Sequence, residues 1–70
     1  MAEIRAEMVA NVWKVLVTEG QTVHAGDTIV ILESMKMEIP VVTDTGGTVM
    51  AVTAVEGGSV QDGDVVAVLG

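Results

Sequence analysis

The residues with the clearest chemical potential lie in one short stretch, Glu33 to Pro40, which reads ESMKMEIP. Lys36 stands there between Met35 and Met37, and the chain contains just one other lysine, Lys14. The amine of an ordinary lysine has a pKa near 10.4, so roughly one amine in 2,500 is the neutral nucleophile at pH 7. Neighbouring carboxylates stabilise the charged form further. Lys36 is therefore not self-activating, so we do not expect it to act as a catalyst by itself; a base that frees its lone pair must come from a partner protein.

Other kinds of site find less support in the sequence. His24 is the sole histidine and lies beside a Gly-Asp turn, while Ser34 and Ser59 do not sit in a nucleophile-elbow motif. The acids at 44–48 and 61–65 lack the ligand spacing of a calcium loop, and one histidine without cysteines cannot complete a zinc site. These acids are interpreted as turn formers, and we expect neither a metal site nor hydrolytic activity.

Charge and hydropathy also limit the partners. Ten acidic against three basic residues give a formal net charge of −7, which repels nucleic acid and anionic lipid headgroups. The longest uncharged run, Thr45 to Val55, has eleven residues and two glycines, too short and too interrupted for a membrane helix. Residues 1–8 do not resemble a secretory signal. We expect an intracellular location, the cytoplasm or, in a eukaryote, the mitochondrial matrix.

The elements that must position Lys36 are β-strands. Seventy residues rich in Val, Ile and Thr, with one aromatic residue and no cysteine, predict a single all-β domain over 1–70. Closely spaced turns favour an antiparallel sandwich or barrel. The faces of Val12 to Val17 stay unassigned, because apolar residues occupy both parities. Strands are expected at Glu3–Ala6, Ala10–Val17, Thr28–Glu33, Met37–Val42, Thr48–Val55 and Val65–Leu69, with short pieces around Val23 and Val60.

The chain also repeats itself. The segment EGQTVHAGDTIVIL, 19–32, matches EGGSVQDGDVVAVL, 56–69, at six of fourteen positions with an offset of 37. Both turn signals, Glu-Gly and Gly-Asp, are preserved in each copy. Two similar halves that share one core are the better interpretation, although turn residues recur for local reasons too. The ESMKMEIP stretch falls between the halves and belongs to neither.

Too little chain separates the flanking strands for anything except a tight reversal, so Met35 and Lys36 are expected at a hairpin tip. A two-residue hairpin loop normally contains Asn-Gly or Asp-Gly, because both central residues need positive φ. Three structural alternatives remain: a merely solvated Lys36, methionines that fill the core, and one helical turn, which Pro40 disfavours. A local rule broken in an otherwise consistent sequence suggests function.

ESMKMEIP, preceded by the Gly-Asp turn at 26–27 and followed by DTGGTVMAV, resembles the biotinyl/lipoyl attachment domain family, especially its small free-standing members. The resemblance covers about 3–69. It implies a flattened barrel of two four-stranded antiparallel sheets with quasi-twofold symmetry, and biotin attached to Lys36 by a biotin protein ligase. Met35, Met37, Glu33 and Glu38 would be contacts for the ligase.

By the same resemblance, the biotin arm would carry a carboxyl group between biotin carboxylase and carboxyltransferase sites. Ser34 stands where biotin carriers commonly have Ala, and a Glu-Ser pair also precedes the lysine of some lipoyl carriers, so lipoate on Lys36 is an alternative. An unmodified interaction module is a second one. We expect a monomer, and the sequence does not indicate which carboxylase is served.

Overall fold

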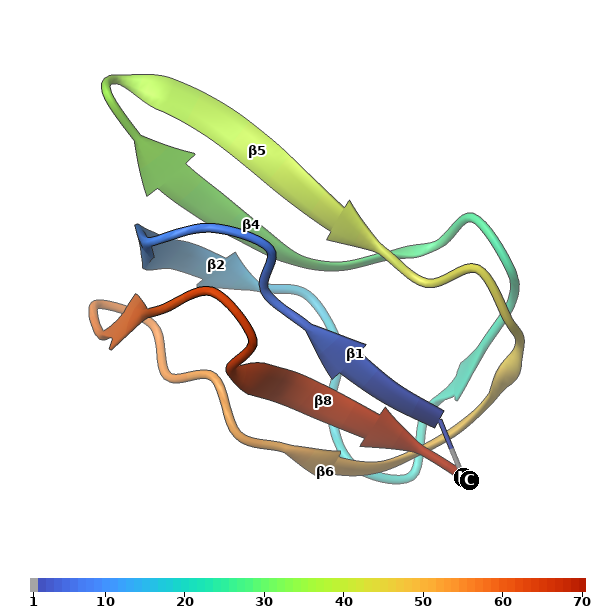
Figure 1. Ribbon diagram of the computed structural model, residues 1–70. Helices are drawn as coiled ribbons and strands as arrows, with labels where there is room; N and C mark the ends of the chain where they lie inside the picture. Colours follow the sequence, from blue (N-terminus) through green and yellow to red (C-terminus); the bar gives the residue numbers. More distant parts are fainter. Residues whose placement is uncertain (1) are drawn as a thin grey trace.

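The computed structural model describes residues 2–70, which form two four-stranded sheets packed face to face (Figure 1). The hairpin sheet has the order β5 (Met37–Val42), β4 (Thr28–Ser34), β2 (Ala10–Val15), β7 (Ser59–Val60). The terminal sheet has the order β1 (Ala2–Arg5), β8 (Val65–Leu69), β6 (Gly47–Val52), β3 (Thr22–Val23). All paired strands are antiparallel, which confirms the predicted all-β fold and the location of all eight strands.

Two strands end earlier than predicted, at corresponding places in the two halves. The predicted strand 10–17 ends at Val15, and the predicted strand 48–55 ends at Val52. The N–H groups of Thr53 and Ala54 both donate to Val66 O, at 3.0 and 3.2 Å, so the regular ladder stops there. The Thr53 hydroxyl also donates to the Val65 carbonyl, where a regular ladder would have a backbone hydrogen bond.

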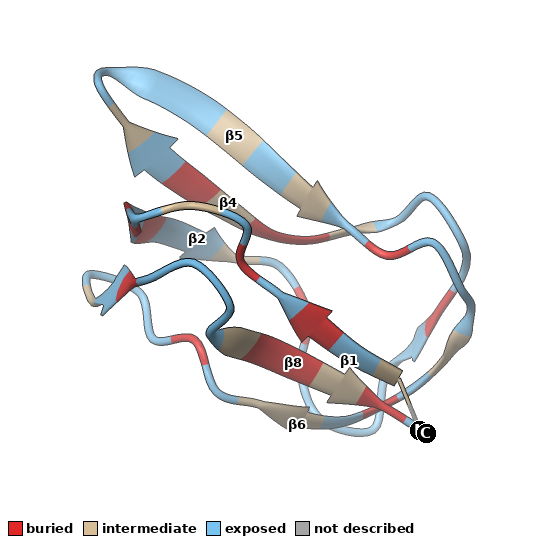
Figure 2. Cartoon of the chain, in the orientation of Figure 1, coloured by how far each residue is buried: buried red, intermediate tan, exposed pale blue. Residues whose placement is uncertain are grey.

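The core lies between the two sheets and is almost entirely aliphatic. Figure 2 shows the buried segments where β2, β4 and β8 face the interior. Branched side chains fill the thin space well because each strand presents alternate residues inward. Thr43 is the one buried polar residue in the described chain. Fully buried apolar side chains come from both halves and include Val23, Ile29, Val30, Leu32, Val49, Val66 and Leu69.

The internal repeat is visible in the hydrogen bonds. Gly26 N–H donates to Thr43 O at 2.7 Å, and Gly63 N–H donates to Ala6 O at 2.8 Å. The two donors are 37 positions apart, and so are the two acceptors. The turn carboxylates repeat as well, since His24 N–H donates to Asp27 Oδ2 at 2.8 Å and Gln61 N–H to Asp64 Oδ2 at 2.9 Å. These matches confirm the predicted quasi-twofold symmetry.

β-Bulges follow the same offset. Trp13 is an extra residue in β2 between the pairs Val12–Leu32 and Lys14–Ile31. Met50 is the extra residue at the equivalent place in β6. Because a bulge adds one residue, it changes which parity of the strand faces the core.

The tip of the β4–β5 hairpin is the place where the two halves differ most. In the terminal sheet, the pair Ala2–Leu69 corresponds to the pair Ile39–Leu32 of the hairpin sheet. The hairpin tip therefore has its counterpart where the start of β1 and the end of β8 lie side by side (Figure 1).

The described residues contain no helix long and apolar enough to span a membrane.

Candidate functional site: the tip of the β4–β5 hairpin

Met35 and Lys36 form a two-residue loop between the paired residues Ser34 and Met37. Their φ angles are +53° and +65°, so both lie in the left-handed region. This is the backbone that a type I′ hairpin loop requires, and it confirms the predicted tight reversal. The helical-turn interpretation of this stretch is wrong, since β4 and β5 run directly into the loop.

The side chains at the tip are poorly suited to this backbone conformation. All other described residues with positive φ are glycines, at 20, 26, 57 and 63. A side chain other than glycine in the left-handed region costs roughly 1–2 kcal/mol. The chain uses glycine at its other tight turns but places Met and Lys at this one, which points to a role for these side chains outside the fold.

The methionines at the tip do not fill the core. Met35 is 92% exposed and Met37 is 64% exposed, so the core-filling interpretation of both residues is wrong. Lys36 is exposed as well, and the whole tip projects beyond the two sheets (Figure 2). Methionine is flexible and polarizable, and exposed methionines suit adaptable contacts with a partner surface.

The two acids that flank the tip lie opposite each other. Glu33 of β4 pairs with Glu38 of β5, and both are exposed. Ser34 is half-buried and forms the closing pair of the loop with Met37. The structure thus brings all five residues predicted for the site, 33 and 35–38, onto one hairpin end.

The Lys36 amine is unengaged in the described part of the chain: the ion pairs there join Arg5 to Glu3 at 2.6 Å and His24 to Asp27 at 3.9 Å. Lys14 has a different environment, because its Nζ lies 5.6 Å from the centroid of the Trp13 ring, within cation–π range. Lys36 stands on a protruding bend, whereas Lys14 lies within strand β2. An enclosed active site can surround the first far more easily than the second.

Other parts of the surface offer less. His24 is exposed in its turn, as predicted, and residues 2–70 contain no group of three or more potential metal-binding side chains. A cavity of about 500 Å³ opens between the edge strands β1 and β5, with Ile4, Met8, Ile39 and Val41 among its lining residues. This groove could not be predicted from the sequence, because β1 and β5 are far apart along the chain.

Comparisons with known proteins agree with this geometry. A family model described as "Biotin-requiring enzyme" matches residues 2–69. The biotinylated protein TB7.3 homolog of Mycobacterium leprae is 50% identical, over 99% of each chain. The biotin/lipoyl attachment protein of Bacillus subtilis is 47% identical, over 89% of this chain and 85% of that protein.

Two solved structures that match this fold are much longer chains. The urea carboxylase of Kluyveromyces lactis matches with a TM-score of 0.91 and 33% identity, over 99% of this chain and 6% of that one. A single-chain, multi-domain long-chain acyl-CoA carboxylase matches with a TM-score of 0.87 and 29% identity, over 94% of this chain and 6% of that one.

The fold, the site and the biotinylated relatives together identify a carrier domain. The chain belongs to the biotinyl/lipoyl attachment domain family.

Proposed function

We propose that this chain is a biotin carrier domain that holds biotin as an amide on the Lys36 amine. The observation that carries the proposal is the position of Lys36, exposed on a two-residue loop whose left-handed backbone presents it beyond the sheets. The relatives named as biotinylated proteins support biotin as the group.

In the coupling step, the neutral Lys36 amine attacks the activated carboxyl carbon of biotinyl-adenylate, which a biotin protein ligase delivers. A C–N bond forms, adenylate leaves with the electrons of the C–O bond, and the attacking nitrogen loses one of its two protons to the ligase's base. No side chain in residues 2–70 forms an ion pair with the amine that would activate it, so the ligase must do so. The loss of one cation changes the formal net charge from −7 to −8.

The fold suits a carrier because a flexible arm projects from a rigid base. Bound biotin would supply a ring nitrogen that accepts and releases a carboxyl group. The paired strands β4 and β5 hold the Lys36 Cα in place, while the unbranched side chain stays free to move. Such tethering raises the effective concentration of the carried group at each partner site.

The side chains around Lys36 are proposed as recognition contacts for the ligase. Met35 and Met37 offer exposed apolar surface on either side of the amine. Glu33 and Glu38 offer two carboxylates to basic residues of the ligase. Met35→Ala and Met37→Ala should each lower the rate of biotinylation, and unchanged rates in both variants would contradict this role.

The decisive test compares Lys36→Arg with Lys14→Arg. Each purified protein is incubated with a biotin protein ligase, ATP and biotin, then examined by streptavidin blotting and intact mass. Wild type and Lys14→Arg should gain one biotin, and Lys36→Arg should gain none. Biotin on Lys36→Arg, or its loss in Lys14→Arg, would disprove the assignment.

Lipoate on the same amine is the second candidate. The Glu-Ser pair at 33–34 and the name of the Bacillus subtilis relative, biotin/lipoyl attachment protein, favour keeping it. Separate incubations with a biotin ligase and a lipoate ligase, followed by intact mass, distinguish the two groups. Recovery of only unmodified protein from cells with ample biotin and ligase would instead support an interaction module.

The proposed partners are a biotin protein ligase and the biotin carboxylase and carboxyltransferase components of a carboxylase. The structural match to parts of urea and acyl-CoA carboxylases supports this set. We place the protein in the cytoplasm, or in the mitochondrial matrix of a eukaryote, as a monomer. No nucleic acid or membrane partner is proposed.

A further inference from the structure

The outward surface of the hairpin sheet carries several apolar residues around Lys14. Cross-strand pairs place Lys14 beside Ile31 and Ile31 beside Pro40, on the side of the sheet opposite the buried Val12 and Leu32. Trp13 is 42% exposed at its bulge. We call the apolar part of this surface the apolar face. It consists of Trp13, Leu16, Ile31, Pro40 and Val42, with Lys14 among them.

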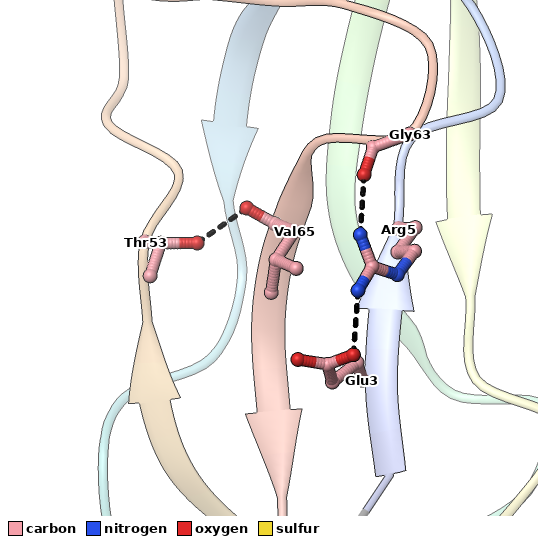
Figure 3. Close-up of polar contacts among 5 residues, drawn as sticks. All are labelled: Glu3, Arg5, Thr53, Gly63 and Val65. Atoms are coloured by element: carbon pink, nitrogen blue, oxygen red, sulfur yellow. Dashed lines mark hydrogen bonds and ion pairs between the residues drawn. The ribbon is translucent and has the colours of Figure 1, made fainter.

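In the terminal sheet, three of the positions that correspond to the apolar face are polar, whereas the counterpart of Lys14 is Ala51. Figure 3 shows Arg5 between Glu3 and Gly63, with its guanidinium 2.6 Å from Glu3 Oε1 and 2.7 Å from the Gly63 carbonyl. Thr53 donates to the Val65 carbonyl on the same sheet. At an offset of 37, the counterparts of the apolar face, in the same order, are Met50, Thr53, Val68, Glu3 and Arg5.

Folding does not require apolar residues at these positions. Both sheets share their bulges and the hydrogen bonds of their Gly-Asp turns, so either set of outward residues is compatible with the backbone. Leu16 is 48% exposed and Val42 is 52% exposed, where the terminal sheet has Thr53 and Arg5. Exposed apolar residues gathered on one face of a soluble protein mark an interaction site.

The apolar face is continuous with the Lys36 tip. The next row of the hairpin sheet, Asn11, Glu33 and Glu38, lies between the apolar face and the closing pair of the loop. An enzyme that encloses Lys36 must bring its surface against the flanks of the hairpin. A partner on this side would meet two carboxylates first and then a tryptophan, the residue type most enriched at the energetic centres of interfaces.

We propose that the apolar face is the docking surface for the biotin protein ligase, a partner region with an apolar centre bordered by Lys or Arg residues. The inference rests on the proposed function, because it deepens the recognition of the same lysine. Charge complementarity supports this partner: the carrier has a net charge of −7 and places Glu33 and Glu38 beside the face. Trp13 would be the anchor, with its ring held under the Lys14 ammonium.

The test uses the symmetry of the fold. Trp13→Lys places a charge on the apolar face, and Met50→Lys places the same charge at the equivalent bulge of the terminal sheet. A second variant, Leu16→Thr with Val42→Arg, copies residues that the other half already carries at these positions. Thermal unfolding followed by circular dichroism checks that each variant is folded.

We expect Trp13→Lys to lower kcat/KM for biotinylation roughly tenfold or more, and the double variant to do so by a similar factor. Met50→Lys should stay within about twofold of wild type, as most surface substitutions do. Equal effects of Trp13→Lys and Met50→Lys, or wild-type rates in both variants of the apolar face, would overturn the docking proposal.

Trp13 also reports directly on docking, because it is the sole tryptophan of the chain. The experiment uses Lys36→Arg, in which no product forms. The emission spectrum of Trp13 in the presence of ligase is obtained by subtracting the spectrum of ligase mixed with the same protein carrying Trp13→Phe. This spectrum should lie at shorter wavelength than that of the carrier alone, because the indole leaves water on docking, and no shift would contradict docking. If the ligase leaves wild type unmodified, the proposed function fails. If it modifies wild type and Trp13→Lys equally well, only the docking surface fails.

Discussion

Glu33 and Glu38 lie directly opposite each other across β4 and β5, one pair below the pair that closes the Lys36 tip. The closing pair of a two-residue hairpin is hydrogen-bonded, so the pair below it is of the non-hydrogen-bonded type, whose side chains approach most closely. Two carboxylates in this arrangement repel each other. Together with the left-handed loop, they make the hairpin end less stable than its strand pairing would allow.

We therefore expect Glu38→Gln to increase the free energy of unfolding by about 0.2–1 kcal/mol, through relief of the repulsion. Urea unfolding at low ionic strength measures the change, and added salt should reduce it because both side chains are exposed. Glu33→Gln is the matched variant and should give a similar gain. A loss of stability in either variant would show that the acid holds a favourable contact.

The loop backbone leads to a second prediction. Met35 has a φ of +53°, which asparagine tolerates far better than methionine. Met35→Asn should increase the free energy of unfolding by about 0.5–1 kcal/mol and, if Met35 contacts the ligase, slow the biotinylation of Lys36. Chemical denaturation and ligase kinetics measure the two effects.

Met37→Asn serves as the control for that substitution. Met37 lies in β5 next to the loop and its φ is not positive, so asparagine brings no conformational benefit there. This variant should be slightly less stable than wild type. Equal stability changes in Met35→Asn and Met37→Asn would mean that the left-handed backbone at Met35 carries no significant strain.

Much of this fold could be predicted because its local rules agree with one another. The Gly-Asp turns at 26–27 and 63–64 and the strands between them follow from turn chemistry and β-branched runs, and the tip at Met35 and Lys36 follows from the short chain between its two strands. The repeat at an offset of 37 doubled the evidence for each turn. The tip stood out because Met and Lys occupy a loop that normally requires other residues.

The faces of β2 could not be predicted, and the bulge at Trp13 explains why. A prediction from alternation assumes that successive residues point to opposite faces of the sheet. The extra residue at the bulge breaks this pattern, so the inward-facing residues are even-numbered before it, at Val12, and odd-numbered after it, at Val15 and Val17. The hydrogen-bond register that decides this depends on β4, which is remote from β2 in sequence. Without it, Trp13 and Leu16 could not be assigned to the outward surface, so the apolar face was not visible.

The two Gly-Asp turns lead to a third prediction, which tests the symmetry itself. Gly26 and Gly63 have φ angles of +93° and +90°, and an added Cβ would meet no atom within 4 Å at either site. The cost of alanine at each position must therefore come from the backbone alone. Gly26→Ala and Gly63→Ala should each lower the free energy of unfolding by about 1–2 kcal/mol.

The two costs should agree within about 0.5 kcal/mol and should add in the double variant, because the turns share no partner: Gly26 N–H donates to Thr43 O and Gly63 N–H to Ala6 O. Gly26→Asn should recover part of the loss, since asparagine accepts left-handed backbone more readily than alanine. Urea unfolding of the four variants measures these changes. Costs that differed widely between the two glycines would mean that the halves share a geometry without sharing its energetics, and the comparison of Trp13 with Met50 would then lose its value as a matched control.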